Sequence, residues 1–145
     1  MQINIKTSAA NQAIVSNLTQ KLPGGAKENI IARVALGYSL STGKRFKQNE
    51  FGTYDSQGKE YKEHILFDSY KGFYVALICQ AYGINKNNEL IPKYVKLHID
   101  HGLEAINYLF ENRPQYTFFD FLIENLGKGI DAIEDAPVSL DAVKN

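Results

Sequence analysis

The sequence has one cysteine, no net charge and no long apolar run, and each absence excludes a class of protein. Cys79 alone allows neither an internal disulfide nor a zinc site built from several cysteines. Sixteen bases balance sixteen acids, which excludes a uniformly basic protein held to nucleic acid by bulk charge. The longest apolar run, Phe73 to Cys79, is too short to cross a bilayer, and the first four residues do not resemble a signal peptide. We therefore expect a soluble, cytoplasmic protein.

The charges are unevenly distributed along the chain. Residues 1–62 carry nine bases and four acids, a net charge of +5, whereas residues 63–145 carry seven bases and twelve acids, a net charge of −5. Such a division indicates that one surface faces an anionic partner while another stays away from it. Chance and the demands of solubility are the alternative explanation. The positions of these residues in the fold must decide between the two.

The chain begins with the pattern of a short strand followed by two helices. Residues Ile3 to Thr7 alternate apolar and polar side chains, which predicts a strand that is either frayed or paired with a second copy of itself. Ser8 is a suitable N-cap for a helix that should end at the turn Pro23-Gly24-Gly25. A second helix is expected over residues 27–42, with Gly43 after its end.

The remainder of the chain is predicted to be helical, which makes the fold class mainly α. Residues 44–62 are polar and indicate a loop or a short hairpin, with residues 53–54 facing 60–61. Further helices are expected over residues 68–82, 92–111 and 116–133, ahead of an acidic tail at 134–145. Gly83 should end the first of these helices, and Pro92 suits the first turn of the next. The helix over 68–82 has so few polar residues that it should lie centrally in the core or in an interface.

The order strand, helix, glycine-rich turn, helix is that of a ribbon-helix-helix unit, the topology of the Met repressor. In ribbon proteins two protomers pair their N-terminal strands, and the strand residues that face away from the core read base edges. Ile3 and Ile5 would then point inward, and Asn4 and Lys6 outward. A helical hairpin with an N-terminal extension is the alternative interpretation of the same order.

Six basic residues are candidates for binding DNA because of their positions in the sequence. Lys44, Arg45 and Lys47 directly follow the second predicted helix and are the densest group of bases. A solvated loop with Phe46 packed in the core, or cations that cap the helix, are the alternatives for this group. The full set of candidates is Lys21, Lys27, Arg33, Lys44, Arg45 and Lys47.

Two histidines are candidate metal ligands, but a packed pair is the better interpretation. His98 and His101 share one face of a helix at i, i+3, and Glu104 joins His101 there. A convincing third ligand is missing nearby in the sequence, so we expect neither a metal nor a cofactor. Cys79 lies in the most apolar helix and should be a core residue. The sequence has no persuasive Ser-His-Asp order and no Walker A spacing, so we assign no catalytic residue and expect no enzyme.

Three segments, taken in order, resemble the DndE family, the small proteins of DNA phosphorothioation (sulfur modification) clusters. The likeness covers roughly residues 5–110. The segments are Asn29-Ile30-Ile31-Ala32-Arg33-Val34-Ala35 with Gly37, Ser39 and Gly43; Asp55 and Gly58-Lys59-Glu60 followed by an apolar helix that closes on Tyr82-Gly83; and Leu97-His98-Ile99-Asp100-His101-Gly102-Leu103 with Leu109.

The resemblance implies a helical fold distantly like the Met repressor and a homo-oligomer, for which a tetramer is one candidate form. It also implies a place in the complex that replaces a non-bridging phosphate oxygen of DNA by sulfur. In that family this subunit is regarded as a DNA-binding component that uses surface lysines, with nicked duplex as a suggested target. The sulfur chemistry belongs to a cysteine desulfurase and an iron–sulfur partner. The single cysteine agrees, since it cannot hold a four-cysteine cluster.

The sequence departs from the family pattern at its C-terminal end. Residues 113–145 extend past the usual end and carry three bases and six acids, a net charge of −3. We therefore divide the chain into a DndE-like helical domain, residues 1–112, and an acidic helical extension and tail, residues 113–145. The extension would cover an interface, dock a partner subunit or compete with DNA. The lysines of the family have no unambiguous match here, so the six candidate bases rest on sequence position alone.

Three functional hypotheses follow from the sequence. The first is a non-enzymatic DNA-binding and scaffolding subunit of a phosphorothioation system, with duplex DNA, other phosphorothioation subunits and further copies of itself as partners. The second is a ribbon-helix-helix transcriptional regulator that reads an operator through its own strand. The third is a metal-dependent nicking enzyme built on His98 and His101. None of these functions involves a membrane.

Overall fold

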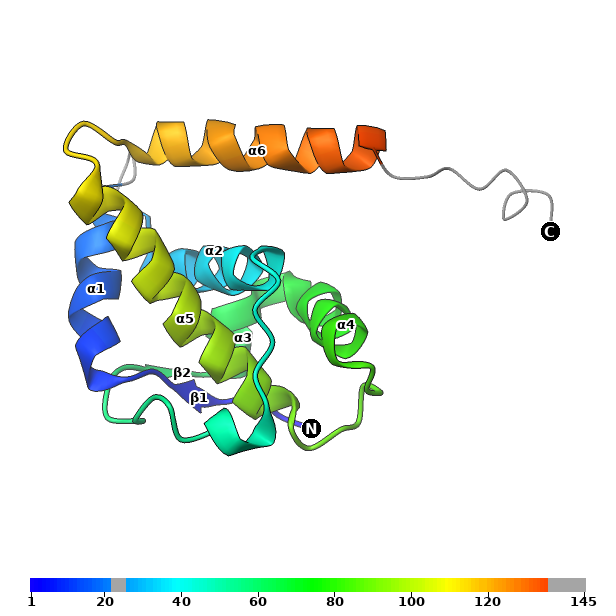
Figure 1. The fold of residues 1–145 in the computed structure, drawn as a ribbon. Coiled ribbons are helices and arrows are strands. Elements are labelled where there is room, and N and C mark those ends of the chain that lie inside the picture. The colour runs from blue at the N-terminus through cyan, green and yellow to red at the C-terminus, as the bar shows by residue number, and fades with distance from the viewer. Residues whose placement is uncertain (22–25, 136–145) are drawn as a thin grey trace. The chain divides into compact units, whose positions relative to one another are not determined.

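Two helices packed against each other form the centre of residues 1–114, and the other elements of this part of the chain lie around them (Figure 1). The computed structural model describes residues 1–21 and 26–135. Helix α2, Glu28–Ser41, and helix α5, Ile91–Asn112, make the most extensive contact between elements. Their facing sides bury apolar residues without exposure to solvent, namely Ala32, Ala35, Leu36, Val95, Ile99 and Leu103. These side chains recur at helical spacing, which is the pattern that the sequence analysis used to predict both helices.

Signals local to the sequence set where the helices begin and end. Helix α1, Ala9–Thr19, begins after Ser8, whose hydroxyl accepts a hydrogen bond from the backbone N–H of Asn11. Helix α4, Lys71–Tyr82, ends at Gly83, which has a left-handed φ of 63°. Helix α5 has a proline in its first turn. The predicted capping and stopping residues are confirmed at these three places. The predicted Pro23-Gly24-Gly25 turn lies outside the described residues.

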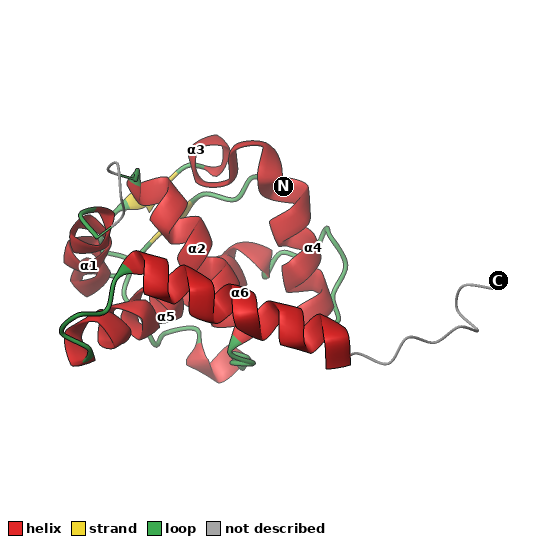
Figure 2. Ribbon diagram, turned by 90° about the horizontal axis from the view of Figure 1, so that it is seen from above, coloured by secondary structure: helices red, strands yellow, loops and turns green. Residues whose placement is uncertain are grey.

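The N-terminal strand pairs within its own chain. Strand β1, Ile5–Lys6, is antiparallel to strand β2, Glu60–Tyr61 (the strands are yellow in Figure 2). Ile5 lies opposite Tyr61. The predicted order of strand, helix and helix is confirmed, and Ile3 and Ile5 are buried while Asn4 and Lys6 are exposed. The expectation that the strand is frayed or pairs with a second copy is wrong, because its partner strand comes from residues 60–61. The predicted hairpin between residues 53–54 and 60–61 is also wrong, because residues 60–61 pair with β1.

The predicted apolar helix over residues 68–82 is shorter than expected and lies at the surface of the chain. Residues before it form helix α3, Glu63–Phe67, and a 3-10 turn, Asp68–Tyr70. A second 3-10 turn, Gln48–Glu50, interrupts the polar loop after α2. Helix α4 buries only Ile78 fully, whereas Tyr70 and Phe73 are more than half exposed. Central burial in the single chain is therefore wrong for this helix, and an interface stays a prediction.

The chain divides into two units, residues 1–114 and residues 115–145. The second unit contains helix α6, Phe118–Asp135. The predicted helix over 116–133 is therefore confirmed within two residues at each end. Of the predicted acidic tail, residues 134 and 135 belong to α6, and residues 136–145 lie outside the described residues. Among the helices that the structure describes, none combines the length and the apolar character needed to cross a membrane.

Candidate nucleic-acid interface

The candidate DNA-binding residues lie mainly at the two opposite ends of α2. Lys27 immediately precedes the helix, and Lys44, Arg45 and Lys47 follow its C-cap, Thr42. A helix of this length is about 20 Å long at 1.5 Å per residue. The structure therefore brings Lys44, Arg45 and Lys47 together and keeps them apart from Lys27, so the predicted bases do not form one patch.

At the N-terminal end of α2, a cavity with a volume of about 410 Å³ has three lysines around it. Lys27, Lys59 and Lys62 line the cavity, together with Tyr61 of β2. Lys59 forms an ion pair with Glu28 in the first turn of α2. No side-chain hydrogen bond caps the start of α2. Ile30 and Ile31 donate their backbone N–H groups to the carbonyl oxygen of Lys27, so the N–H groups that an anion would use are those of Glu28 and Asn29, at the very start of the helix. A phosphate group is the kind of ligand that this combination of lysines and helix N-terminus favours.

Lys59 and Lys62 at this end were not among the bases predicted from the sequence. They are more than thirty residues from Lys27 along the chain and reach it only because β2 pairs with β1. Their one visible signal was the excess of bases in residues 1–62. The hydroxyl of Tyr61 is buried and has no hydrogen-bond partner within the described part of the chain. Burial raises the pKa of this hydroxyl, with a smaller contribution from the charge of Glu28.

At the C-terminal end of α2, the bases differ in what they contact. The guanidinium of Arg45 donates hydrogen bonds to the carbonyl oxygens of Leu40, at 3.3 Å, and Lys44, at 2.7 Å. It therefore caps the helix, as the alternative interpretation expected. The ammonium of Lys44 lies 3.5 Å from a carboxylate oxygen of Glu50. The side chain of Lys47 is exposed and has no ion pair within the described residues, so it is the base of this group that is most available to a ligand.

The two other candidate bases have different surroundings. Arg33, in the middle of α2, donates a hydrogen bond of 3.0 Å to the carbonyl oxygen of Leu66 in α3 and lies over the ring of Tyr70 at 5.6 Å. Its guanidinium therefore satisfies a carbonyl near the end of α3 and holds that short helix against α2. Lys21 follows α1 and is exposed. Lys21, Lys27 and Lys47 thus remain the candidates whose charged ends face solvent.

The two predicted histidines are packed in a chain of hydrogen bonds. Tyr82 accepts the backbone N–H of Phe46 at 2.9 Å, and its hydroxyl lies 2.6 Å from Nε2 of His98. Nδ1 of His98 and Nδ1 of His101 each lie 2.7 Å from the hydroxyl of Ser39. Each hydroxyl has one proton to donate, and one arrangement satisfies all three contacts. The Tyr82 hydroxyl donates to Nε2 of His98, Nδ1–H of His98 donates to the Ser39 hydroxyl, and that hydroxyl donates to Nδ1 of His101. We therefore assign His98 as the Nδ1–H tautomer and His101 as the Nε2–H tautomer.

Burial keeps these histidines neutral. His98 has no exposed surface, and burial, assisted by the charge of Arg45, lowers its pKa to about 3. Burial also lowers the pKa of His101, and the charge of Lys44 adds to this effect. The expected partner Glu104 instead accepts a hydrogen bond from Tyr54 at 3.0 Å. Among the described residues, no group of three histidine, cysteine, aspartate or glutamate side chains is placed to hold a metal ion.

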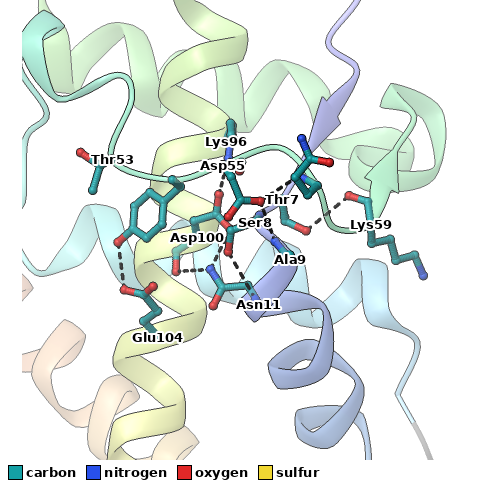
Figure 3. Close-up of polar contacts among 12 residues, drawn as sticks. Thr7, Ser8, Ala9, Asn11, Thr53, Asp55, Lys59, Lys96, Asp100 and Glu104 are labelled. Carbon is teal, nitrogen blue, oxygen red and sulfur yellow. Dashed lines mark hydrogen bonds and ion pairs between the residues drawn. The ribbon is translucent and has the colours of Figure 1, made fainter.

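A second polar cluster, which the sequence analysis missed, joins the N-terminal segment to α5 (Figure 3). The carboxylate of Asp100 is completely buried and accepts three hydrogen bonds. The donors are the backbone N–H of Ser8 at 3.0 Å, the side-chain amide of Asn11 at 2.7 Å and the ammonium of Lys96 at 2.6 Å. A buried charge needs such a set of partners. The cluster therefore ties the start of α1 to α5.

Asp55 extends this cluster from the loop that precedes β2 (Figure 3). One of its carboxylate oxygens accepts the backbone N–H of Ala9 at 2.9 Å, which satisfies an otherwise unpaired donor of α1. This bond lowers the pKa of Asp55. Gly58 follows, and a Cβ there would lie 2.2 Å from the carbonyl oxygen of Ser8. The loop therefore approaches the N-terminal segment more closely than any other residue type allows.

These features define a helical protein in which one buried polar cluster ties α2 to α5 and another ties the N-terminal segment to α5, with basic side chains at both ends of α2. A family model described as "DNA sulphur modification protein DndE" matches residues 4–113. The chain belongs to this family. A crystal structure of DndE from Escherichia coli B7A, described as involved in DNA phosphorothioation modification, has the same fold, with 15% sequence identity and a TM-score of 0.55. The match covers 71% of this chain and 95% of that one. The comparison with curated proteins finds no match.

Proposed function

We propose that this chain is a non-enzymatic DNA-binding and scaffolding subunit of a DNA phosphorothioation system, and that it binds duplex DNA, nicked duplex included. Membership of the DndE family carries the proposal. The exposed bases at both ends of α2 support it, because cationic side chains at separated points can contact separate phosphate groups of one duplex. A role on DNA also implies the cytoplasm as the place of action.

The proposal assigns different roles to the six candidate bases. Lys21, Lys27 and Lys47 contact phosphates, because their side chains are exposed. Arg33 and Arg45 act first on the fold, because their guanidinium groups hold carbonyl oxygens of α3 and α2. Lys44 also acts first on the fold, because its ammonium pairs with Glu50. Lys62 joins the phosphate-binding set, since it lines the same cavity as Lys27.

The absence of catalysis by this subunit is part of the proposal. The most suggestive pair of groups, the hydroxyl of Ser39 and the imidazole of His98, is 2.7 Å apart but has no exposed surface. A nucleophile must reach its substrate, so this pair serves packing. The sulfur chemistry then belongs to partner subunits, and this chain contributes DNA contacts and docking surfaces.

Self-association is also part of the proposal. Tyr70 and Phe73, at the start of α4, are 54% and 61% exposed, and large aromatic side chains at that exposure favour a partner surface. We propose a homo-oligomer, with a tetramer as the form to test first. The regulator hypothesis also needs a second copy, but it requires β1 to pair across the two copies, whereas β1 pairs with β2 of its own chain.

Fluorescence anisotropy with labelled duplexes, nicked and intact, tests the DNA-binding role. The double variant Lys27→Ala/Lys47→Ala should weaken binding to every duplex sequence about equally. It should also reduce the slope of log affinity against log salt by about 0.9 for each lost phosphate contact. The double variant Lys86→Ala/Lys93→Ala, which removes two exposed lysines elsewhere, is the matched control and should bind like the parent.

The same titrations separate the alternatives. A parent protein that binds neither duplex contradicts the proposal. Tight binding to one operator sequence and weak binding to all others favours the ribbon-helix-helix regulator instead. Cleavage of one strand only when a divalent metal ion is added, lost in His101→Ala, favours the metal-dependent nicking enzyme.

A further inference from the structure

Helix α6 has one apolar stripe that is open to solvent. Phe119, Ile123, Leu126, Ile130 and Ile133 follow one another at intervals of four, three, four and three residues, which is the spacing of a helix seam. At 100° per residue the five side chains fall within an arc of about 80°. Their exposed fractions lie between 53% and 76%. A stripe of this length and exposure needs a partner surface.

Phe118 and Phe121 in the first turn of α6 are buried, but the composition of the rest of the helix indicates that a partner stabilises it. Gly127 and Gly129 lie within the helix, and each costs about 1 kcal/mol relative to alanine. The acids Asp120, Asp131 and Glu134 lie along one flank of the stripe. Two α6 helices placed side by side would bring like charges together, so a second α6 is an unfavourable partner.

A groove on the other unit of the chain has complementary properties. Between α2 and α4 lies a depression of about 510 Å³, lined by the apolar side chains of Leu40, Leu77 and Ala81 and by Arg45. Gly37 also lines the groove, and a Cβ added at this glycine would meet no atom within 4 Å. The groove is therefore apolar and open, and it carries a cation at the C-terminal end of α2.

The charges of the two units are opposite. Residues 1–114 carry fourteen bases and ten acids, a net charge of +4, and residues 115–145 carry two bases and six acids, a net charge of −4. An acidic helix and a basic body attract each other at contact, and the attraction favours this pairing over contacts between like units.

We propose that α6 of one copy docks its apolar stripe into the α2–α4 groove of a second copy of this chain. The inference rests on the homo-oligomer in the proposed function and names the two surfaces that meet. The two surfaces are different, so the contact is heterologous: each copy gives one helix and receives one. Such a contact builds a closed ring when the rotation between neighbouring copies closes, and an open filament when it does not. Residues 118–135 lie beyond the family match, which ends at 113. The contact is therefore an addition to the family fold.

Light scattering on the full-length protein, without DNA, tests the contact from both sides. Ile123→Glu/Leu126→Glu places charges on the stripe, and Gly37→Phe fills the groove. Each should raise the dissociation constant of the assembly at least tenfold, so that monomer predominates where the parent is an oligomer. Lys128→Gln, a change on the opposite face of α6, is the matched control and should leave the mass unchanged. Ser41→Glu, which adds an acid at an exposed residue of the groove, is a second acceptor variant.

Mixing the variants gives the decisive result. The stripe variant keeps its groove and the Gly37→Phe variant keeps its stripe, so an equimolar mixture should form a one-to-one dimer that neither variant forms alone. A parent protein that is a monomer at 50 μM, variants that keep the parent mass, or a mixture that stays monomeric would each overturn the proposal. Because the measurement contains no DNA, a protein that assembles this way yet ignores DNA contradicts the proposed function and not this contact.

Discussion

Gly102 of α5 lies directly against the backbone of Ala35 in α2. A Cβ on Gly102 would come within 1.9 Å of the carbonyl oxygen of Ala35, a distance that only a shift of backbone relieves. Because α2 carries basic side chains at both of its ends, this contact also sets where those side chains lie. The glycine is therefore required by the closeness of the two central helices.

Gly102→Ala should lower the free energy of unfolding by about 3 kcal/mol or prevent folding, because the added methyl group meets backbone on a helix that cannot move freely. Urea denaturation followed by circular dichroism measures the change. Gly72→Ala is the matched control, because a Cβ at that exposed helical glycine meets nothing within 4 Å. It should raise stability by about 0.5–1 kcal/mol. Equal stability of the two variants would contradict this account of the α2–α5 contact.

Asp100→Asn should destabilise the protein by about 3–5 kcal/mol. The substitution removes a buried charge from three donors and turns an amide N–H₂ toward at least one of them, which leaves the ammonium of Lys96 without its ion pair. Thermal and urea denaturation measure the loss. Glu89→Gln removes one carboxylate at an exposed position and should change stability by less than about 0.5 kcal/mol. A similar small effect at Asp100 would show that the cluster does not hold the N-terminal segment.

Much of the helical fold was predictable because its signals are local. Ser8, Gly83 and Pro92 each act on the residues next to them, and the sequence predicts the corresponding helix ends correctly. The strand pair was not predictable. The alternation over residues 3–7 predicted β1, but the two residues of β2 are too few to carry a period, and the two strands meet across more than fifty residues. The pairing depends on tertiary contacts such as the approach of Gly58 to Ser8.

In the candidate site, too, groups of neighbouring residues were predictable from the sequence, whereas groups that form only through tertiary contacts were not. The group after α2 was visible because Lys44, Arg45 and Lys47 are neighbours in the sequence. The group at the start of α2 was incomplete, because Lys59 and Lys62 join Lys27 only after β2 is in place. The run of bases in the sequence did not predict what each base contacts: Arg45 caps α2, Lys44 pairs with Glu50 and Lys47 is exposed.

The stability of the protein should fall as the pH decreases from 6.5 toward 3. His98 is neutral in the folded protein, with a pKa of about 3, whereas in the unfolded chain it binds a proton below about pH 6.5. The unfolded state therefore gains a proton that the folded state does not, and about 2 kcal/mol of stability is lost at pH 5. The melting temperature measured at pH 7 and pH 5 should differ less in His98→Gln than in the parent.

His64→Gln is the control for this pH dependence. His64 is exposed, so its replacement should leave the difference between pH 7 and pH 5 as it is in the parent. Carboxylates such as Glu63, whose pKa the ammonium of Lys71 lowers, contribute in the acidic range in all three proteins. The contributions of these carboxylates to the pH dependence cancel when the variants are compared with the parent. A parent-like pH dependence in His98→Gln would contradict the assignment of His98 as a buried neutral group.

Arg45→Ala and Lys47→Ala should have opposite effects, although the residues are two positions apart. Arg45 caps α2 through the carbonyl oxygen of Leu40, so its loss should lower stability by about 1 kcal/mol and leave the salt dependence of DNA binding nearly unchanged. Lys47→Ala should have the reverse effects, because this side chain is exposed. Its loss should leave the melting temperature unchanged and reduce the slope of log DNA affinity against log salt by about 0.9. The triple variant Lys44→Ala/Arg45→Ala/Lys47→Ala should show both effects. If it binds nicked and intact duplex like the parent, this end of α2 is not the DNA site. The phosphates then lie at the other end, with Lys27 and Lys62, which line the cavity beside the first turn of α2 together with the Lys59–Glu28 ion pair and Glu60.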